Sequence, residues 1–287
     1  MPDLYYAMTL PPKAAIAYFK AKGYQVTDSW RELWQEAHAR AFTVARCAKL
    51  DVLADIRTAL DTAMAEGITY REFLKQLRPQ LEAKGWWGQA IDKETGEIVE
   101  HYEDSSRPVE YGSPRRLKTI YQTNLQTAYM AGRYRTLKDS TESHPYWQYV
   151  AVMDKRTRPS HAAMNGRVFG HDDGIWGTHF PPNGFNCRCR VRPVSEGSMK
   201  REGLFLSDST GHTREIEVPI SKRKPAAGST IVTAYQGPGM DKPFAPDPGW
   251  NYNPGEHGER LAELEAQKLS AADPAIQAAH RKESGGG

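Results

Sequence analysis

The chain has 287 residues, of which 39% are hydrophobic and 25% charged, with a formal net charge of +3; this length suits one large domain or two ordinary ones, with enough apolar residues for a core. The small charge does not by itself predict nucleic-acid binding, and no segment approaches the roughly 20 apolar residues of a membrane span. Three cysteines, an odd number, argue against a disulfide framework, and the first residues lack the pattern of a signal peptide, so we expect a soluble protein of a reducing compartment.

Residues 1–88 have the pattern of a helical region. Apolar side chains recur at helical spacing in four segments, residues 12–22, 29–44, 53–64 and 70–81. Thr69 followed by Glu72, like Ser29 followed by Glu32, has the spacing of a capping box at a helix N-terminus. We expect these stripes to be the core-facing sides of a helical bundle.

Residues 89–112 break this periodicity, because they are mostly charged and rich in turn-forming residues. We expect a polar linker or a short hairpin there. Ser113 and Pro114 then have the residue types of a helix N-cap and first helical position, and apolar residues continue at helical spacing to about Gly132. A long helix is therefore predicted to open the central part of the chain.

Two segments of the central part alternate as strands do, residues 146–153 and 187–194. Beyond residue 195, glycine, proline, serine and lysine become frequent, which is typical of a linker or an extended arm. The sequence thus predicts an α+β fold. Its expected parts are a helical N-terminal region (1–88), a polar linker or hairpin (89–112), a small mixed α/β central domain (113–195) and an irregular C-terminal arm (196–287) with a disordered end.

Two cysteines one residue apart lie in the second predicted strand. In a strand, Cys187 and Cys189 point to one side and the cations Arg188, Arg190 and Arg192 to the other. Two thiolates need a metal or a positive charge beside them, so zinc is a candidate. The alternative is that both cysteines are small buried hydrophobic residues. Candidates for a third and a fourth zinc ligand lie upstream: His161, Asp154, His171 and His179.

A group of charged residues directly follows the first predicted strand: Asp154, Arg156 and Arg158. They form either an ion-pair and turn network that pins two strands together, or part of a metal-dependent nuclease site with cations for phosphate. The second interpretation uses further residues of the same segment: His161, Asn165, Asp172, Asp173 and His179. Because their spacing matches no catalytic motif, we assign no catalytic and no cofactor-binding residue.

Two other features of the central part stand out. Gly166, in the sequence NGRVF, is typical of a tight turn. Cations in the first turn of a helix oppose its macrodipole, which points to an anionic contact, although solvated arginines are the commoner explanation. The candidate contacts to phosphate or to a partner are four arginines: Arg115, Arg116, Arg190 and Arg192.

Several blocks of sequence occur in an order typical of one family. They are RRLKTIYQTNLQTAYMAGRY, HPYWQYVAVMD, DKRTRPSHAAMNGRVF, FPPNGFNCRCRV and DPGWNYNPG, preceded by the helical segments TLPPKAAIAYFKAKG and GITYREFLKQLRPQLEAKGWWG. Through these blocks, which include Pro182 and Arg188, the chain resembles the phage Mu protein F-like family of minor head, or head-morphogenesis, proteins. The resemblance covers most of the chain.

The resemblance implies a low-copy protein inside the phage head, near the portal, that is made in the host cytoplasm and assists procapsid assembly, with a further role in DNA packaging or ejection. It implies a portal, scaffold or major capsid protein as partner, phage DNA as a further candidate, and no membrane. The alternatives are a packaged metal-dependent nuclease or toxin-like enzyme, and a head factor that binds DNA through Arg188, Arg190 and Arg192.

The chain departs from the family pattern where relatives have two further zinc-type ligands. Many relatives carry Cys-x-x-Cys after Asp-x-Arg, and a histidine shortly before Cys-Arg-Cys. Here Arg158 and His161 stand at the first pair, and Gly184 stands in place of the histidine. The resemblance therefore implies that only His161, Cys187 and Cys189 persist as candidate zinc ligands.

Overall fold

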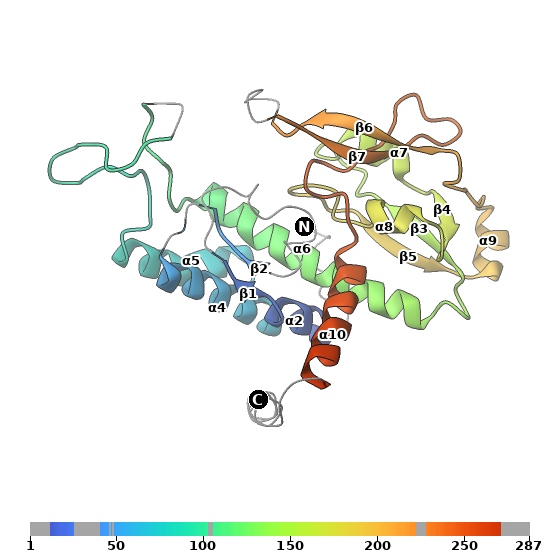
Figure 1. The fold of residues 1–287 in the computed structure, drawn as a ribbon, viewed down its shortest axis with the longest axis horizontal. Helices are drawn as coiled ribbons and strands as arrows, with labels where there is room; N and C mark the ends of the chain where they lie inside the picture. Colours follow the sequence, from blue (N-terminus) through green and yellow to red (C-terminus); the bar gives the residue numbers. More distant parts are fainter. Residues whose placement is uncertain are drawn as a thin grey trace.

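The computed structural model describes residues 12–25, 41–45, 47, 49–102, 106–221 and 228–270. Figure 1 shows one long helix, α6 (Pro114–Asp139), running through the middle of the molecule. The N-terminal helices lie along one part of α6, and the sheets formed by residues 146–235 lie beside its other end. This mixed arrangement of N-terminal helices followed by small antiparallel sheets confirms the predicted α+β class.

Three helices of the N-terminal region pack against α6: α2 (Pro12–Lys20), α4 (Leu50–Glu66) and α5 (Tyr70–Ala83). Their apolar stripes form one buried cluster, as the helical periodicity predicts. The Thr69 side chain accepts a hydrogen bond from the Glu72 N–H at 3.4 Å, so the predicted cap of α5 is confirmed. α4 ends at Gly67, whose φ of 68° lies in the left-handed region that favours glycine.

The prediction of helix over residues 29–44 is wrong at its C-terminal end, and its part up to residue 40 lies outside the described residues. Ala41–Phe42 form strand β2, which pairs in parallel with β1 (Gly23–Tyr24). Phe42 is buried, and its ring meets that of Phe19 edge-on at 5.5 Å. Burial of this ring against α2 and pairing with β1 outweigh the helical spacing of the segment.

The described residues 89–102 and 106–112 form the irregular excursion that projects from the body in Figure 1. Isolated antiparallel bridges hold it together, such as Ile91 with Ile98, and the Gly96 N–H donates to the Asp92 carbonyl across a tight turn. The expected short hairpin is therefore present around this turn. At its base Trp86 is buried in the N-terminal core.

Helix α6 begins where the sequence predicts, since Ser113 accepts a hydrogen bond from the Arg116 N–H at 3.2 Å. Its first half belongs to the N-terminal cluster, and its second half, from Met130 to Leu137, belongs to a second cluster under the sheet. Because one helix contributes to both cores, the domain limits at residues 88 and 113 stay a prediction.

The central sheet has three antiparallel strands in the order β4-β3-β5: β3 (Tyr146–Val150), β4 (Val168–Gly170) and β5 (Arg190–Val194). The short helices α7 (Pro159–Met164) and α8 (Ile175–His179) connect them. Both predicted strands exist, but they are shorter than expected: β3 ends at Val150 and β5 begins only at Arg190. Gly166 has a φ of 84° and its N–H donates to the Tyr149 carbonyl, which confirms the predicted turn.

The prediction of an extended C-terminal arm is wrong for the described residues beyond 195. They form α9 (Glu196–Glu202), a hairpin of β6 (Thr213–Pro219) and β7 (Ser229–Tyr235), and α10 (Pro254–Ser270), which lies against α6. Tyr235 and Phe244 are fully buried in the central cluster. Aromatic burial thus holds a segment whose glycines and prolines suggest a linker. The expected disordered end lies outside the described residues.

Across the described residues, no helix is both long and apolar enough to cross a membrane.

Candidate metal-binding site

The candidate site forms between helix α7 and the segment that leads into β5. His161 lies on α7, which starts at Pro159, and Cys187 and Cys189 precede the strand. The expected alternation holds although the strand begins later: Cys187, Cys189 and Val191 are buried, whereas Arg188, Arg190 and Arg192 are half-buried. An extended backbone is enough to turn neighbouring side chains to opposite sides.

The three predicted ligands come together. The ligand atoms of His161, Cys187 and Cys189 lie within 4.8 Å of one another, and all three residues are buried. The His161 Nδ1 atom is 3.4 Å from the Cys189 Sγ and 3.7 Å from the Cys187 Sγ. Nitrogen and sulfur ligands of one tetrahedral zinc are about 3.5 Å apart, from bond lengths near 2.0 and 2.3 Å. The spacing of these three atoms therefore fits zinc.

The pKa values of the two cysteines are shifted in opposite directions. A hydrogen bond from Cys189, and then the His161 ring, hold the pKa of the Cys187 thiol below its ordinary value. The same bond, together with burial, raises the pKa of Cys189. The thiolate form is therefore favoured at Cys187 and the thiol form at Cys189.

The fourth side of this group is occupied by an arginine. The Arg158 Nη1 atom lies 3.3 Å from the His161 Nε2 atom. A guanidinium only donates, so Nε2 accepts and the proton of a neutral ring sits on Nδ1, facing the sulfurs. Zinc bound at Nδ1 would need the opposite tautomer, in which an N–H would face the Arg158 N–H. The tautomer thus argues against zinc at this atom.

The expected fourth ligands do not join the group. Asp154 forms a bidentate ion pair with Arg188, whose Nη1 and Nη2 atoms donate to the two carboxylate oxygens at 2.7 and 2.5 Å. His179 is buried elsewhere, against the Thr178 hydroxyl and the Phe244 carbonyl. Among the described residues, His161, Cys187 and Cys189 are the whole of the candidate metal group. The residues present therefore fit a closed four-ligand zinc site only in part.

An ion pair lies where the family pattern has its other two ligands. Arg158 donates to Asp247 at 2.7 Å and to the Phe185 carbonyl at 2.7 Å. A Cβ atom on Gly184 would collide with the Asp247 carboxylate and lie 2.8 Å from the Arg158 Nη1 atom. The loop before the cysteines is thus shaped around this pair. In the predicted ion-pair network, Asp154 therefore pairs with Arg188, and the partner of Arg158 is Asp247.

The other residues of the expected nuclease site have separate structural roles. Asn165 accepts from the Ala151 N–H at 2.9 Å, and Asp173 accepts from the backbone of Ile175 and Ser209 at 2.8 and 3.1 Å. Asp172 lies beside Gly170. These contacts cap turns and tie loops together, and they do not surround one point where a metal could sit.

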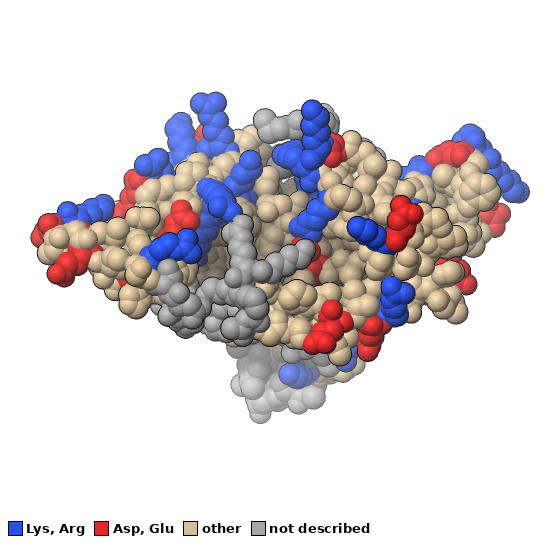
Figure 2. Space-filling model, turned by 90° about the horizontal axis from the view of Figure 1, so that it is seen from above, with Lys and Arg blue, Asp and Glu red and all other residues tan. Residues whose placement is uncertain are grey.

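Most of the candidate phosphate contacts have protein partners. Arg192 pairs with Glu202 at 2.5 Å, and Arg188 with Asp154. Arg116 donates to the backbone carbonyls of residues 45, 110 and 111, and its guanidinium lies over the Trp86 ring. On the face shown in Figure 2, the described Lys and Arg side chains stand among Asp and Glu side chains and form no continuous stripe.

The remaining predicted residues lie at the edge of the group. Arg156 is exposed and 3.5 Å from Asp154. Pro182 is buried and follows a cis peptide bond with Pro181. Arg190 pairs in the sheet opposite Val150, and Arg115 is exposed on α6.

Sequence reasoning missed two residues that shape the site. Phe244 is fully buried and its ring contacts the ring of His161 at 5.2 Å. Asp247 is the only acidic residue in the run FAPDPGWNYNPG. This isolated acid was the available signal, because the arginine-rich segment around residues 156–158 needs a carboxylate partner.

Known proteins are similar to this chain over most of its length. The family model described as Phage Mu protein F like protein matches residues 54–192. A protein of Escherichia phage Mu named as capsid assembly protein F is 48% identical over 88% of this chain and 56% of its own length. The FluMu F protein of a Mu-like prophage in Haemophilus influenzae is 41% identical over 80% of this chain and 53% of its own length.

The chain spans about half the length of these curated relatives. No solved structure matches it. The identity extends over both the helical N-terminal region and the cysteine-containing centre, since each alignment covers at least 80% of the chain. The chain belongs to the phage Mu protein F-like family.

Proposed function

We propose that the protein takes part in assembling the head of a Mu-like phage, as a low-copy component that joins the procapsid near the portal. One observation carries this proposal: the 48% identity, over 88% of the chain, to a phage Mu protein named for capsid assembly. Homologous chains of this identity share a fold and commonly a role, but their activities reside in particular sites. The portal, a scaffold or the major capsid protein is the expected partner.

The site geometry supports a structural role rather than the nuclease alternative. Nuclease metals such as Mg²⁺ prefer oxygen ligands, whereas the assembled group offers one imidazole and two sulfurs. The oxygen ligands that a nuclease would need, Asp154 and Asp173, are engaged with Arg188 and with backbone N–H groups. We therefore keep the proposal that the protein is not an enzyme.

Direct binding of DNA through the arginine row is also disfavoured. A phosphate contact gains affinity by neutralising charge and releasing counterions. Arg188 and Arg192 already face carboxylates, so each would have to give up an ion pair first. Protein contacts are the better supported mode of action.

The proposal is tested with procapsids and virions purified from cells that make the phage with and without this protein. Mass spectrometry should find the protein in heads at a few copies per portal ring, and electron microscopy should find fewer complete heads when it is missing. Complementation with the intact gene should restore normal heads. If infected cells make the protein but procapsids and virions both lack it, the head-assembly proposal is wrong.

A further inference from the structure

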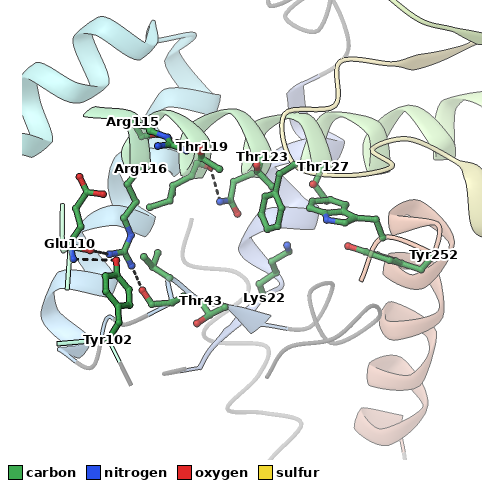
Figure 3. Close-up of a pocket in the computed structure, with 16 residues that line it drawn as sticks. Lys22, Thr43, Tyr102, Glu110, Arg115, Arg116, Thr119, Thr123, Thr127 and Tyr252 are labelled. Carbon is green, nitrogen blue, oxygen red and sulfur yellow. Dashed lines mark hydrogen bonds between the residues drawn. The ribbon is translucent and has the colours of Figure 1, made fainter. Parts of the chain in front are cut away.

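A cavity of about 420 Å³ lies between α6, the β1–β2 pair and the segment that precedes α10. Figure 3 shows threonines of α6 along one wall, with Lys22 and Thr43 on the opposite side and Tyr252 at one end. Thr119, Thr123 and Thr127 are spaced by four residues, so they share one face of the helix. The volume is in the range of natural ligand sites, roughly 300 to 1,000 Å³.

Two buried polar groups of this cavity have no hydrogen-bond partner among the described residues. The Lys22 side chain is only 6% exposed, and its Nζ atom lies 5.0 Å from the centre of the Tyr18 ring without a carboxylate beside it. The Thr123 hydroxyl is buried and unpaired. Figure 3 shows Lys22 extending toward α6, on which Thr123 lies. A buried ammonium and a buried hydroxyl both cost free energy unless something pairs with them.

Among the described residues no carboxylate pairs with Lys22, and its surroundings make the charged form of its side chain less stable. Burial, and then the positive charge of Arg57, lower the pKa of Lys22 to about 7. Among the described residues that line the cavity, Glu110 is the single carboxylate, and in Figure 3 it lies at the far end, beside Arg116. An anionic group brought in by a ligand would restore the charged form of Lys22 and satisfy the Thr123 hydroxyl.

The other residues that line the cavity indicate which chemical groups a ligand would carry beside its anion. Phe185, Trp250 and Tyr252 contribute aromatic walls, and the threonine methyl groups add apolar surface. Arg116 donates to three backbone carbonyls, so its guanidinium serves the protein's own loops. Arg115, the third cation of the described lining, is exposed on α6, so Lys22 is the one buried cation without a protein hydrogen bond. A buried cation within aromatic walls fits a single carboxylate next to an apolar side chain. A phosphodiester chain would need a groove with a row of cations.

We propose that this cavity binds an acidic peptide segment of a partner protein, with a Glu or Asp carboxylate on Lys22 and Thr123 and the neighbouring apolar side chain against Trp250 and Tyr252. The site needs no metal and uses neither His161 nor the two cysteines; it shares Phe185, whose carbonyl accepts from Arg158, with that part of the molecule. It is also independent of the head-assembly proposal, because binding is measured on the purified chain.

The test compares two peptides that differ in one charge, Ac-Phe-Glu-NH2 and Ac-Phe-Gln-NH2, by ligand-observed NMR titration of the purified full chain. The Glu peptide should bind about tenfold more tightly, as expected for a buried charge-assisted hydrogen bond. Lys22→Met should reduce this preference to about twofold or less. Since the variant also removes an unpaired buried charge, its melting temperature should stay equal or rise.

Thr123→Val is the second variant, because it keeps the shape of the side chain and removes the unpaired hydroxyl. It should weaken the binding of the Glu peptide and leave the affinity for the Gln peptide unchanged. Lys118→Met, at an exposed position of the same helix, is the matched control and should change neither affinity. Equal binding of the two peptides by the unaltered chain overturns the proposal. So does tight binding of single-stranded dT10 that Lys22→Met abolishes, since that assigns the cavity to nucleic acid.

Discussion

Phe244 provides the sharpest measure of whether the C-terminal segment belongs to the central core. Its side chain is 0% exposed, and its ring contacts the rings of Tyr149, His161 and His179 at 6.0, 5.2 and 5.4 Å. Its backbone pairs with Tyr235 through two hydrogen bonds of 2.8 Å. Truncation of Phe244 to alanine removes the ring but leaves that backbone pairing possible. The variant therefore measures how much the packing of the ring contributes to the free energy of unfolding.

Phe244→Ala should lower the free energy of unfolding by about 3–5 kcal/mol, as for other fully buried phenylalanines. The upper part of this range is expected, because three aromatic neighbours each add about 0.5–1.5 kcal/mol beyond area burial. Such a loss is a large part of the roughly 5–15 kcal/mol that stabilises a typical domain.

The measurement is guanidinium unfolding followed by tryptophan fluorescence, with the midpoint and slope compared between variants. Phe205→Ala is the matched control, because Phe205 is 87% exposed and its loss should change stability by no more than about 0.5 kcal/mol. If the two variants differ by less than about 1 kcal/mol, the segment is a loose arm after all and the packing described above is wrong.

Three further predictions concern the site and its surroundings. In a double-mutant cycle of unfolding free energies, Arg158→Met and Asp247→Asn should show a coupling energy of only about 0.5–1 kcal/mol, because both side chains are more than a third exposed. A coupling energy of zero would show that this ion pair does not stabilise the fold. Protein purified without chelator should hold well under one zinc per chain and melt unchanged in EDTA, and about one zinc per chain together with a lower melting temperature would establish the metal instead. Burial lowers the pKa of His179 to about 4 from an ordinary value of 6.5. Between these two pH values the unfolded chain binds a proton at His179 that the folded chain does not bind, so the free energy of unfolding should fall by about 3 kcal/mol as the pH drops from 7 to 4. His179→Gln should flatten this pH dependence, and an unchanged dependence would show that other groups cause it.

Local features of the fold followed from the sequence wherever the responsible residues are neighbours. Ser113 and Thr69 cap their helices because the groups that they bond are three residues away. The turn at Gly166 is equally local, since it needs only a left-handed glycine. The alternation of Cys187, Arg188 and Cys189 required nothing more than extended backbone.

The mistaken parts have a common cause in distant contacts. Ala41–Phe42 carry a helical pattern but form a strand, because Gly23–Tyr24 and the Phe19 ring offer them a partner and a buried position. The residues after 195 have the composition of a linker, but Phe244 finds a place in the central core. Composition describes the average residue of a segment, whereas one aromatic side chain is enough to anchor it.

The sequence by itself determined the family, the α+β class and the grouping of His161 with Cys187 and Cys189 as one chemical unit. Only the tertiary structure decided what completes that unit: Arg158 lies against His161 and pairs with Asp247, 89 residues further along the chain. It also placed Lys22 in a buried position beside α6, where no carboxylate of the described residues pairs with it. Helix caps, turns and alternation depend on residues within a few positions of one another, so a sequence displays them. The partner of a buried charge is set by how whole elements pack, and no local pattern encodes it.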